Sequence, residues 1–275
     1  MKQNNGSSIP VKVLRYLLMA FVLVISLYPI LWVLLNSFKQ TPGGLGLPEK
    51  WVFDGYITIF TKLNIGQYFL NSLIVTVIST VISVFAVSLA AYVSARISFK
   101  GKSLVTLMFA STLFIPSISI SFPIYRLLSD LGLKDTLTGV IFVYASLGIA
   151  VTFFILRSYF LSIPKEMEEA AMMDGCNRFQ CFWKVVFPLM TPINVTQLVL
   201  NTLFIWNDYS TSIILLRKKY SFTLTLAQII YFNENTTMLN EAFAFFIMAM
   251  IPILILYLCM QKYIVSGITA GAVKG

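Results

Sequence analysis

The acidic residues of this 275-residue chain gather at one place. Glu166, Glu168 and Glu169, three of its eleven acidic residues, lie within four positions of a polar segment between two apolar stretches. Carboxylates in the first turn of a helix are stabilised by the positive end of the helix dipole. The residues that follow, Ala170 and Ala171, are small enough to let another protein approach the helix closely. Clustered charge and small side chains favour non-covalent docking as the chemistry of this segment.

Catalytic and metal-binding chemistry is not expected from the remaining residue types. The sequence contains no histidine, and its three cysteines, Cys176, Cys181 and Cys259, lack the paired spacing of a disulfide framework or a zinc site. It also lacks a Ser/His/Asp arrangement and a glycine-rich phosphate-binding loop. We therefore expect a chain that binds no metal or cofactor itself and is not an enzyme.

The residues around the acids predict two short helices separated by a bend. Pro164 suits the first turn of a helix, where its missing N–H costs no hydrogen bond. This first helix should run to about Met173 and stop at Gly175, because glycine is common just past a helix C-terminus. Asn177 can then cap a second helix. The second helix would carry a one-sided apolar stripe, formed by Phe179, Phe182, Trp183, Val186 and Phe187.

Two explanations of this helix pair remain open. A short amphipathic helix can dock into a groove of another protein, or it can lie in the membrane interface. The clustered acids fit poorly beside an anionic lipid leaflet, so the sequence favours docking to a partner protein.

Composition places most of the chain in a membrane. It is 58% hydrophobic and 11% charged, whereas soluble domains carry about 25% charged residues. Six charge-free stretches of about 20 residues or more can each cross roughly 30 Å of hydrocarbon, and helices satisfy their backbone groups there. We predict an all-α membrane protein with a single transmembrane domain over residues 1–275. Its six transmembrane helices would span approximately 14–36, 69–95, 103–126, 137–159, 187–213 and 242–264.

Two prolines fall within the third of these spans. Proline removes a helix hydrogen bond and clashes with the preceding turn. We expect Pro116 to kink this span and Pro123 to end it.

Basic residues set the expected orientation. Twelve of the 20 Lys and Arg residues lie in the termini, the link between the second and third spans, and the link between the fourth and fifth spans, counted from Arg157. Because cytoplasmic segments carry an excess of Lys and Arg, we expect cytoplasmic termini and a cytoplasmic 162–188 loop. The cluster over residues 217–219 runs against this assignment. The net charge of +9 reflects residues that flank membrane spans rather than nucleic-acid binding.

The loop over residues 162–188, hereafter the coupling loop, resembles a motif of a known family. Glu-Ala-Ala at 169–171, Gly175 and the run ending in Pro188 are similar to the cytoplasmic "EAA" loop of importer-type ABC-transporter permease subunits. Phe187 stands where leucine is usual, and Cys176 where alanine is common. The likeness extends to the sugar-permease class with six spans, through Asn36–Lys39, Asn71–Ser72, Ala91–Tyr92, Ala95–Arg96, Ile205–Tyr209 and the maltose-type ending Tyr263–Gly275.

This resemblance implies partners and site residues. It implies a heterodimer with a second permease, two ATPase subunits that hold ATP and Mg, an extracytoplasmic substrate-binding protein, and membrane lipid. The first helix of the coupling loop would dock in a cleft of the ATPase, and the C-terminal tail, with Gly271 and Lys274, would reach towards the ATPase interface. The expected coupling residues are Glu166, Glu169, Ala170, Ala171, Met173, Asp174, Gly175 and Pro188.

Other polar residues are candidates for a substrate pathway. Asp208 is an acid at the edge of an apolar stretch, where a charge is costly and is a functional candidate. Asn207 and Tyr209 make its surroundings polar enough for sugar hydroxyls. The alternative places Asp208 at an outer end, against headgroups or the partner permease. Asn71 is a further candidate, but Asn71 and Ser72 could instead cap the second span.

Together these features predict a permease subunit of an ATP-driven importer in the bacterial inner or plasma membrane. Its substrate would be an oligosaccharide or related sugar, and the chain would form half of the translocation pore. Two alternatives stay open: a secondary transporter, which would show internal repeats and intramembrane charges, and a membrane scaffold without transport.

Overall fold

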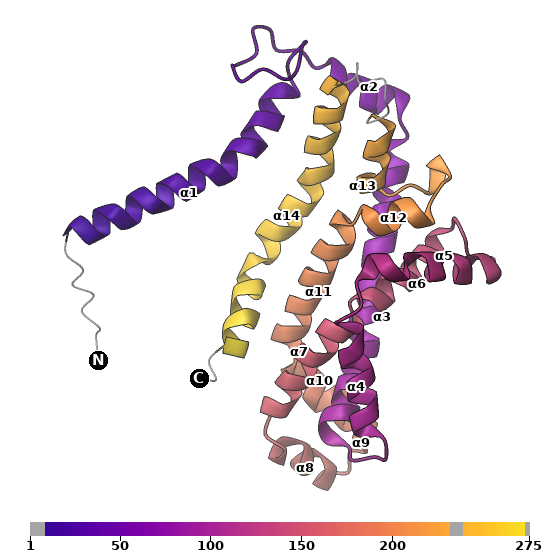
Figure 1. The fold of residues 1–275 in the computed structure, drawn as a ribbon. Coiled ribbons are helices and arrows are strands. Elements are labelled where there is room, and N and C mark those ends of the chain that lie inside the picture. The colour runs from indigo at the N-terminus through magenta and orange to yellow at the C-terminus, as the bar shows by residue number, and fades with distance from the viewer. Residues whose placement is uncertain (1–8, 232–238, 273–275) are drawn as a thin grey trace. The chain divides into compact units, whose positions relative to one another are not determined.

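The computed structural model describes residues 9–231 and 239–272 (Figure 1). In these residues the secondary structure is helical, with no strand. The chain forms two compact units, one of Met1–Asn64 with Gln228–Ile251 and one of Ile65–Ala227 with Pro252–Gly275. The all-α prediction is confirmed.

The first unit contains α1 (Ile9–Asn36), α2 (Asp54–Lys62), the 3-10 turn η4 (Gln228–Ile230) and the beginning of α14 (Leu239–Ala272). Between α1 and α2 the chain folds around the ring of Phe38, which packs on Trp51, Phe53 and Tyr56 with centroids 5.3–5.5 Å apart. Asn240 of α14 donates a 2.5 Å hydrogen bond to the carbonyl of Lys39. These contacts fix the segment that leaves α1.

The second unit is built around α3 (Ile65–Arg96), a single helix of 32 residues. Three helices pack along it: α6 (Leu137–Leu147), α7 (Ile149–Ser162) and α11 (Thr191–Asn207). Small residues allow this close packing, and the buried face of α3 carries Ser72, Thr76, Ser79, Thr80, Ser83 and Ser88. We call the Arg96 end of α3 its loop end and the Ile65 end its far end.

The shorter elements of the second unit gather at these two ends. After the loop end come α4 (Lys102–Thr112) and, further along the chain, the coupling-loop helices α8 (Glu166–Met173), α9 (Arg178–Cys181), η2 (Phe182–Val186) and α10 (Phe187–Leu189). Near the far end lie α12 (Ser210–Leu215), η3 (Lys219–Ser221) and α13 (Leu224–Ala227) (Figure 1).

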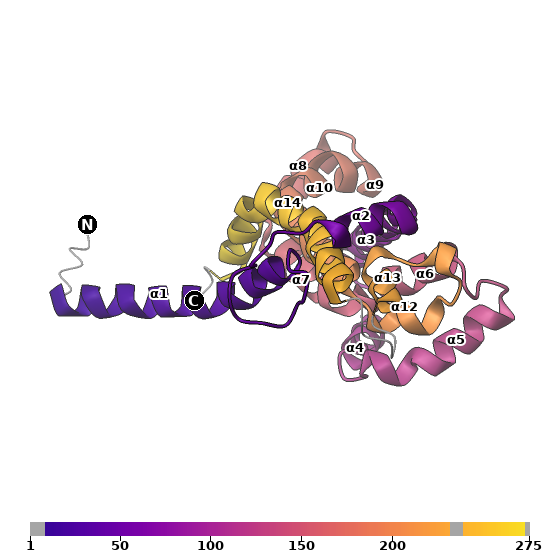
Figure 2. The ribbon, with the colours of Figure 1, turned by 90° about the horizontal axis from the view of Figure 1, so that it is seen from above.

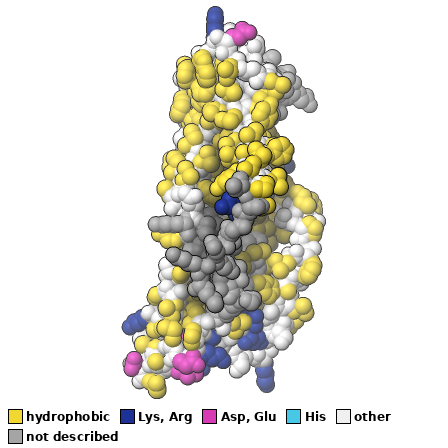
Figure 3. All heavy atoms as spheres, turned by 90° about the vertical axis from the view of Figure 1, so that its left-hand side faces the viewer, with side chains coloured by type: hydrophobic (Ala, Val, Ile, Leu, Met, Phe, Trp, Pro, Cys, Tyr) yellow, Lys and Arg dark blue, Asp and Glu magenta, His cyan; other side chains and the backbone are white. Residues whose placement is uncertain are grey.

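The described residues contain three helices long and apolar enough to cross a membrane: Pro10–Asn36, Ile65–Arg96 and Leu239–Gln261. Three bent pairs also qualify if each pair crosses as one span: Lys102–Thr112 with Ser117–Asp130, Leu137–Leu147 with Ile149–Ser162, and Arg178–Leu189 with Thr191–Asn207. The structure therefore holds three to six candidate spans, where the sequence predicted six. On the face drawn in Figure 3, hydrophobic side chains are widespread and charged side chains are few.

The third predicted span breaks where proline was expected to bend it. The helix α4 ends at Thr112, and Pro116 precedes the 3-10 turn η1 (Ser117–Ile120) and α5 (Ser121–Asp130). The two halves meet at 100°, and Figures 1 and 2 show α5 leading away from α4. The expectation for Pro123 was wrong, because this residue lies in the first turn of α5, where proline leaves no extra donor unpaired. It begins a helix rather than ending one.

Candidate functional site

The helix α8 of the coupling loop ends as the sequence predicted. Gly175 adopts φ +88°, a left-handed conformation that glycine reaches without steric cost. Its N–H donates to Met172 O at 3.1 Å, and the N–H of Cys176 donates to Ala171 O at 3.0 Å. These two bonds form a Schellman motif, which closes the last turn of the helix. The start differs slightly from the prediction: Pro164 lies before α8 rather than in its first turn, because Lys165 is the N-cap residue.

Asn177 caps α9, as predicted. Its side-chain oxygen accepts a hydrogen bond from the N–H of Gln180 at 2.8 Å, and the Gln180 side chain accepts one from the N–H of Asn177 at 3.0 Å. This reciprocal capping box satisfies two backbone donors that the helix cannot pair itself. The loop therefore makes a fixed turn between α8 and α9.

The apolar stripe after this cap is only partly buried within the chain. Phe182 and Val186 are fully buried, Trp183 and Phe187 are partly buried, and Phe179 is 66% exposed. Phe182–Val186 form a π-helical turn, and such a turn shifts the side-chain positions relative to a regular α-helix. The exposed ring of Phe179 touches the ring of Trp183 edge-on at 6.2 Å.

The three acids of α8 do not share one face. Glu166 and Glu169 are exposed, whereas Glu168 is 6% exposed. A helix turns by about 100° per residue, so positions 166 and 169 lie on one side and position 168 on another. The spacing of these three positions could have predicted from the sequence alone that Glu168 faces a different side, but this inference was not drawn.

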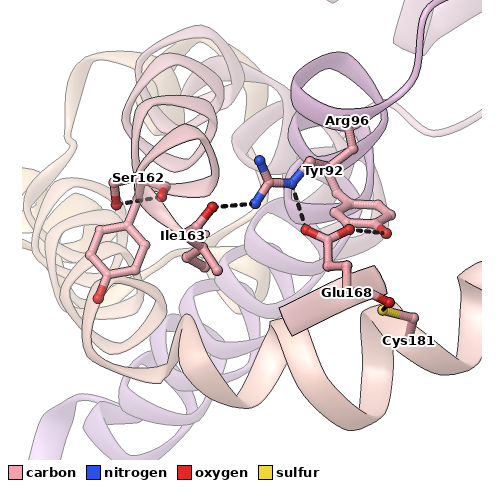
Figure 4. Close-up of polar contacts among 7 residues, drawn as sticks. Tyr92, Arg96, Ser162, Ile163, Glu168 and Cys181 are labelled. Atoms are coloured by element: carbon pink, nitrogen blue, oxygen red, sulfur yellow. Dashed lines mark hydrogen bonds and ion pairs between the residues drawn. The ribbon is translucent and has the colours of Figure 1, made fainter. Parts of the chain in front are cut away.

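The Glu168 carboxylate is held by the loop end of α3 (Figure 4). One oxygen accepts a hydrogen bond from Arg96 Nε at 2.5 Å, and the other accepts one from the hydroxyl of Tyr92 at 2.9 Å. Arg96 Nη2 also donates to the carbonyl of Ile163, just after α7, at 2.6 Å. One guanidinium thus joins α3, the end of α7 and α8.

This ion pair is buried. The side chains of Arg96 and Glu168 are 6% and 9% exposed. Removing one partner of a buried pair leaves an uncompensated charge, which costs roughly 3–5 kcal/mol. Sequence reasoning did not single out Arg96 or Tyr92 for this role, because they stand more than 70 positions from Glu168 along the chain.

An apolar cluster surrounds the pair. The ring of Phe182 lies 5.0 Å from Tyr92 and 6.4 Å from Phe160. Ala171 and Cys181 are buried in the same cluster. Burial raises the pKa of the Cys181 thiol above its usual value, and the negative charge of Glu168 raises it further, so this thiol stays protonated at neutral pH.

The opposite face of α8 is open. Glu166, Glu169, Ala170 and Asp174 are exposed, and Met173 is 84% exposed. The two alanines expected to act together are therefore divided, because Ala171 packs inward while Ala170 faces outward. Exposed methionine is typical of adaptable binding surfaces. The exposed residues offer three carboxylates, those of Glu166, Glu169 and Asp174, near the apolar side chain of Met173.

The candidate pathway residues lie at the far end of the second unit. The Asp208 carboxylate accepts hydrogen bonds from the Tyr144 hydroxyl at 3.0 Å and from the N–H groups of Ser210 and Thr211 at 3.0 and 3.2 Å. It therefore holds the start of α12. Asn207 is exposed, and its neighbour Tyr209 is partly buried.

Asn71 makes contacts that were not predicted from the sequence. It is 1% exposed, and its amide donates to the carbonyls of Tyr220 and Phe222 at 2.8 and 2.9 Å. Ser72 accepts a hydrogen bond from the N–H of Leu224 at 2.7 Å. The capping expectation was wrong, because α3 already begins at Ile65. These two side chains instead hold residues 220–224 against α3.

Comparison with known proteins identifies the family. A family model described as "Binding-protein-dependent transport system inner membrane component" matches residues 83–270. The chain belongs to this family of ABC-importer permeases. The match contains the whole coupling loop, together with Tyr92 and Arg96.

Individual relatives agree with this assignment. The "Probable ABC transporter permease protein YurM" of Bacillus subtilis (strain 168) is 36% identical, over 90% of this chain and 84% of the relative. The "Melibiose/raffinose/stachyose import permease protein MelC" and the "Arabinooligosaccharides transport system permease protein AraQ" of the same organism are 34% and 33% identical. The match to MelC covers 89% of this chain and 90% of the relative, and that to AraQ covers 96% and 97%.

A solved structure is similar as well. It is the "Crystal structure of a bacterial ABC transporter involved in the import of the acidic polysaccharide alginate", with a TM-score of 0.82 and 25% identity. The match covers 94% of this chain and 99% of that one. The all-helical permease fold of the chain is thereby shown.

As a permease of this family, the chain is a multi-pass inner-membrane subunit of a binding-protein-dependent importer. Family membership favours this reading over the two alternatives, a secondary transporter and a scaffold. Of the other expected site residues, Pro188 is exposed in α10, and Gly271 lies in the last turn of α14. Lys274 lies outside the described residues. Among the described residues, no group of His, Cys, Asp or Glu could hold a metal ion.

Proposed function

We propose that this permease forms one half of a translocation pore for an oligosaccharide or related sugar. Its single domain over residues 1–275 would pair with a second permease, and six spans would line and support the pore. The support for a sugar comes from relatives such as MelC and AraQ, whose names specify raffinose-type sugars and arabinooligosaccharides. The alginate transporter is a further polysaccharide importer of the same fold.

The two-faced helix α8 carries the proposal for coupling. Its inward face is tied to α3 through Glu168, and its outward face presents Glu166, Glu169, Ala170 and Met173. A short helix with one face fixed and the other exposed fits the groove of a partner. That partner would be one of two ATPase subunits, which hold ATP and Mg. The turn at Asp174 and Gly175 would set the depth of docking, and Pro188 would join the loop to the next span.

The same proposal fixes the orientation. The coupling loop and both termini would face the cytoplasm, and the C-terminal tail with Gly271 and Lys274 would approach the ATPase interface. The far end of α3 would face outwards, towards the binding protein. Asn207 and Tyr209 would border the substrate pathway there, while Asp208 and Asn71 hold the backbone that positions them.

Closure of the ATPase pair would push α8. The loop continues into α7 on one side and into α11 on the other, so these helices would swing together. The pore would change from inward-open to outward-open and receive substrate from the docked binding protein.

Co-purification tests this function. The chain is tagged, expressed together with its chromosomal neighbours and purified from the membrane. We expect a second permease and an ATPase to accompany it, and the complex to hydrolyse ATP faster with its binding protein and one of a panel of neutral oligosaccharides. A stable chain that purifies without any ATPase would contradict the proposal.

A substitution sharpens this test. Glu169→Arg reverses a charge on the exposed face of α8 and should reduce the amount of ATPase that co-purifies. Lys134→Gln, in the link between α5 and α6, is the matched control and should retain it. If Glu169→Arg and Glu166→Arg together left the ATPase bound in full amount, α8 would not be the docking helix.

A further inference from the structure

The helix α3 is bonded to other segments at both of its ends. At the loop end, Arg96 and Tyr92 bind the Glu168 carboxylate of α8. At the far end, Asn71 and Ser72 bind backbone groups of residues 220–224. No covalent neighbour of α3 is involved in either joint, since its partners are more than 70 positions away in sequence.

The coupling loop contacts α3 along one face of its last turns. Phe85, Tyr92 and Arg96 are spaced by seven and four positions, which places them on the same side of a helix. The Phe85 ring stacks on Phe187 at 5.4 Å and on Trp183 at 6.0 Å. The loop is therefore seated on α3 by rings as well as by the ion pair.

The spans joined covalently to the loop are bent, and α3 is not. The pair α6 and α7 bends by 45° at Gly148, and the helix that leaves the loop bends by 75° near Met190. α3 runs unbroken through 32 residues, a length of about 48 Å at about 1.5 Å per residue. A bend can absorb a displacement at one end, whereas a continuous helix passes it to the other end.

At the far end, α3 meets a segment whose backbone is held firmly. The Asp135 carboxylate accepts hydrogen bonds from the N–H groups of Arg217 and Lys218 at 2.8 and 3.0 Å. The side chains of residues 217–219 are exposed, and Tyr220 is 66% exposed. We call residues 216–224 the far segment; it presents three cationic side chains on a fixed backbone.

We propose that α3 is the rod that transmits displacement of α8 to the far segment, with the Arg96–Glu168 pair as its driven joint. Arg96 and Glu168 are positioning residues in this scheme, and Asn71 and Ser72 form the output joint. The inference rests on the proposed function, because it takes the ATPase as the source of the displacement. It adds a path to the far segment through a span that is not covalently joined to the loop.

A labelling experiment on the purified complex tests this path without a known substrate. The three native cysteines are replaced by alanine, and Tyr220→Cys provides one exposed thiol on the far segment. Its rate of reaction with a maleimide is measured in the absence and presence of Mg-ATP with vanadate. We expect nucleotide to change the rate at least about fivefold, the lower end of the range for coupled sites.

Variants at both joints should abolish this response. Glu168→Gln keeps the side-chain shape and Arg96→Gln shortens the side chain; both remove the ion pair, and Asn71→Ala removes the output joint. In each variant the labelling rate with Mg-ATP and vanadate should be about the same as the rate without nucleotide. The ATPase should still co-purify with each variant. The double variant Glu168→Gln with Asn71→Ala should lose no more of the response than either single variant, because both changes interrupt one path. Arg96→Lys keeps a cation and should retain part of the response that Arg96→Gln loses. Lys100→Gln removes a cation after the same end of α3 and should leave the response intact.

Several other outcomes would contradict the proposal that α3 transmits the displacement. If nucleotide leaves the labelling rate of the parent unchanged while the ATPase is bound, the far segment does not receive the displacement. If the response survives in Glu168→Gln, the displacement travels by another path. If Glu168→Gln instead releases the ATPase, the pair only shapes the docking surface. Failure of the parent to bind an ATPase at all would refute the proposed function itself.

Discussion

The two ends of α3 are joined to their partners by different chemistry. At the loop end a buried cation, Arg96, meets a buried anion, Glu168. At the far end the neutral side chains of Asn71 and Ser72 bind backbone groups. Loss of one ionic partner strands a charge, whereas loss of a neutral partner strands only uncharged polar groups. The loop end should therefore be the more sensitive of the two.

The two ends also differ in how far the joint depends on the sequence of the partner segment. Backbone groups are present in every residue, so a side chain such as Asn71 can hold a segment whatever its sequence. An ion pair needs both partners, and it fixes which helix meets which. The permease thus specifies the position of α8 through side chains and the position of residues 220–224 through the backbone.

The largest predicted effect is at Arg96. Arg96→Ala leaves the Glu168 carboxylate buried without its cation and should destabilise the complex by about 3–5 kcal/mol. Thermal unfolding in detergent measures the loss. The double variant Arg96→Gln with Glu168→Gln should lose less, because no charge remains buried. If Arg96→Ala unfolded at the same temperature as Lys100→Ala, the pair would contribute nothing to stability.

A smaller effect is predicted at the far end. Asn71→Ala leaves the carbonyls of Tyr220 and Phe222 without their shared donor and should cost about 1–3 kcal/mol. The same unfolding assay compares it with Arg96→Ala. Gln67→Ala removes only the neighbour that donates to Asn71 and should cost less. A larger loss at Asn71 than at Arg96 would reverse the comparison between the two ends.

Local signals in the sequence foretold local structure. The stop at Gly175, the cap at Asn177 and the break at Pro116 each depend on the backbone preferences of one residue and its neighbours. The apolar stretches likewise located the long helices, because a span needs only length and hydrophobicity.

The joints of α3 could not be found in this way. Glu168 meets Arg96 across 72 positions and Asn71 meets Phe222 across 151, and no local pattern encodes such a partner. The bends at Gly148 and Met190 were also missed. At Met190 a local signal was present, because Pro188 and Pro192 flank the bend; no proline lies beside Gly148. The π-helical turn at Phe182–Val186 was likewise not predicted, because the stripe was drawn on a regular helix.

Within the loop end, the turn at Gly175 comes next in size. Gly175→Ala places a Cβ on a residue with φ +88°, and no heavy atom lies within 4 Å of that Cβ. The cost is therefore conformational, roughly 1–2 kcal/mol, and should appear as lower stability of the loop in hydrogen exchange. Gly66→Ala is the matched control, because its added Cβ also meets no neighbour but its backbone is helical. Equal behaviour of the two variants would show that the left-handed turn carries no strain.

The smallest predicted effect concerns the capping box. Asn177→Ala removes the acceptor for the N–H of Gln180 and should cost about 1 kcal/mol. Asn177→Asp keeps an oxygen at the same place and should restore the stability. Faster amide exchange at residues 178–181 in Asn177→Ala, but not in Asn177→Asp, would locate the loss in the cap. Because the ion pair anchors α8 and not α9, the Arg96–Glu168 joint should still form in both variants. The nucleotide-dependent change in labelling rate should therefore persist in Asn177→Ala. If Asn177→Ala lost this response as fully as Glu168→Gln does, the whole loop, rather than α8, would drive α3.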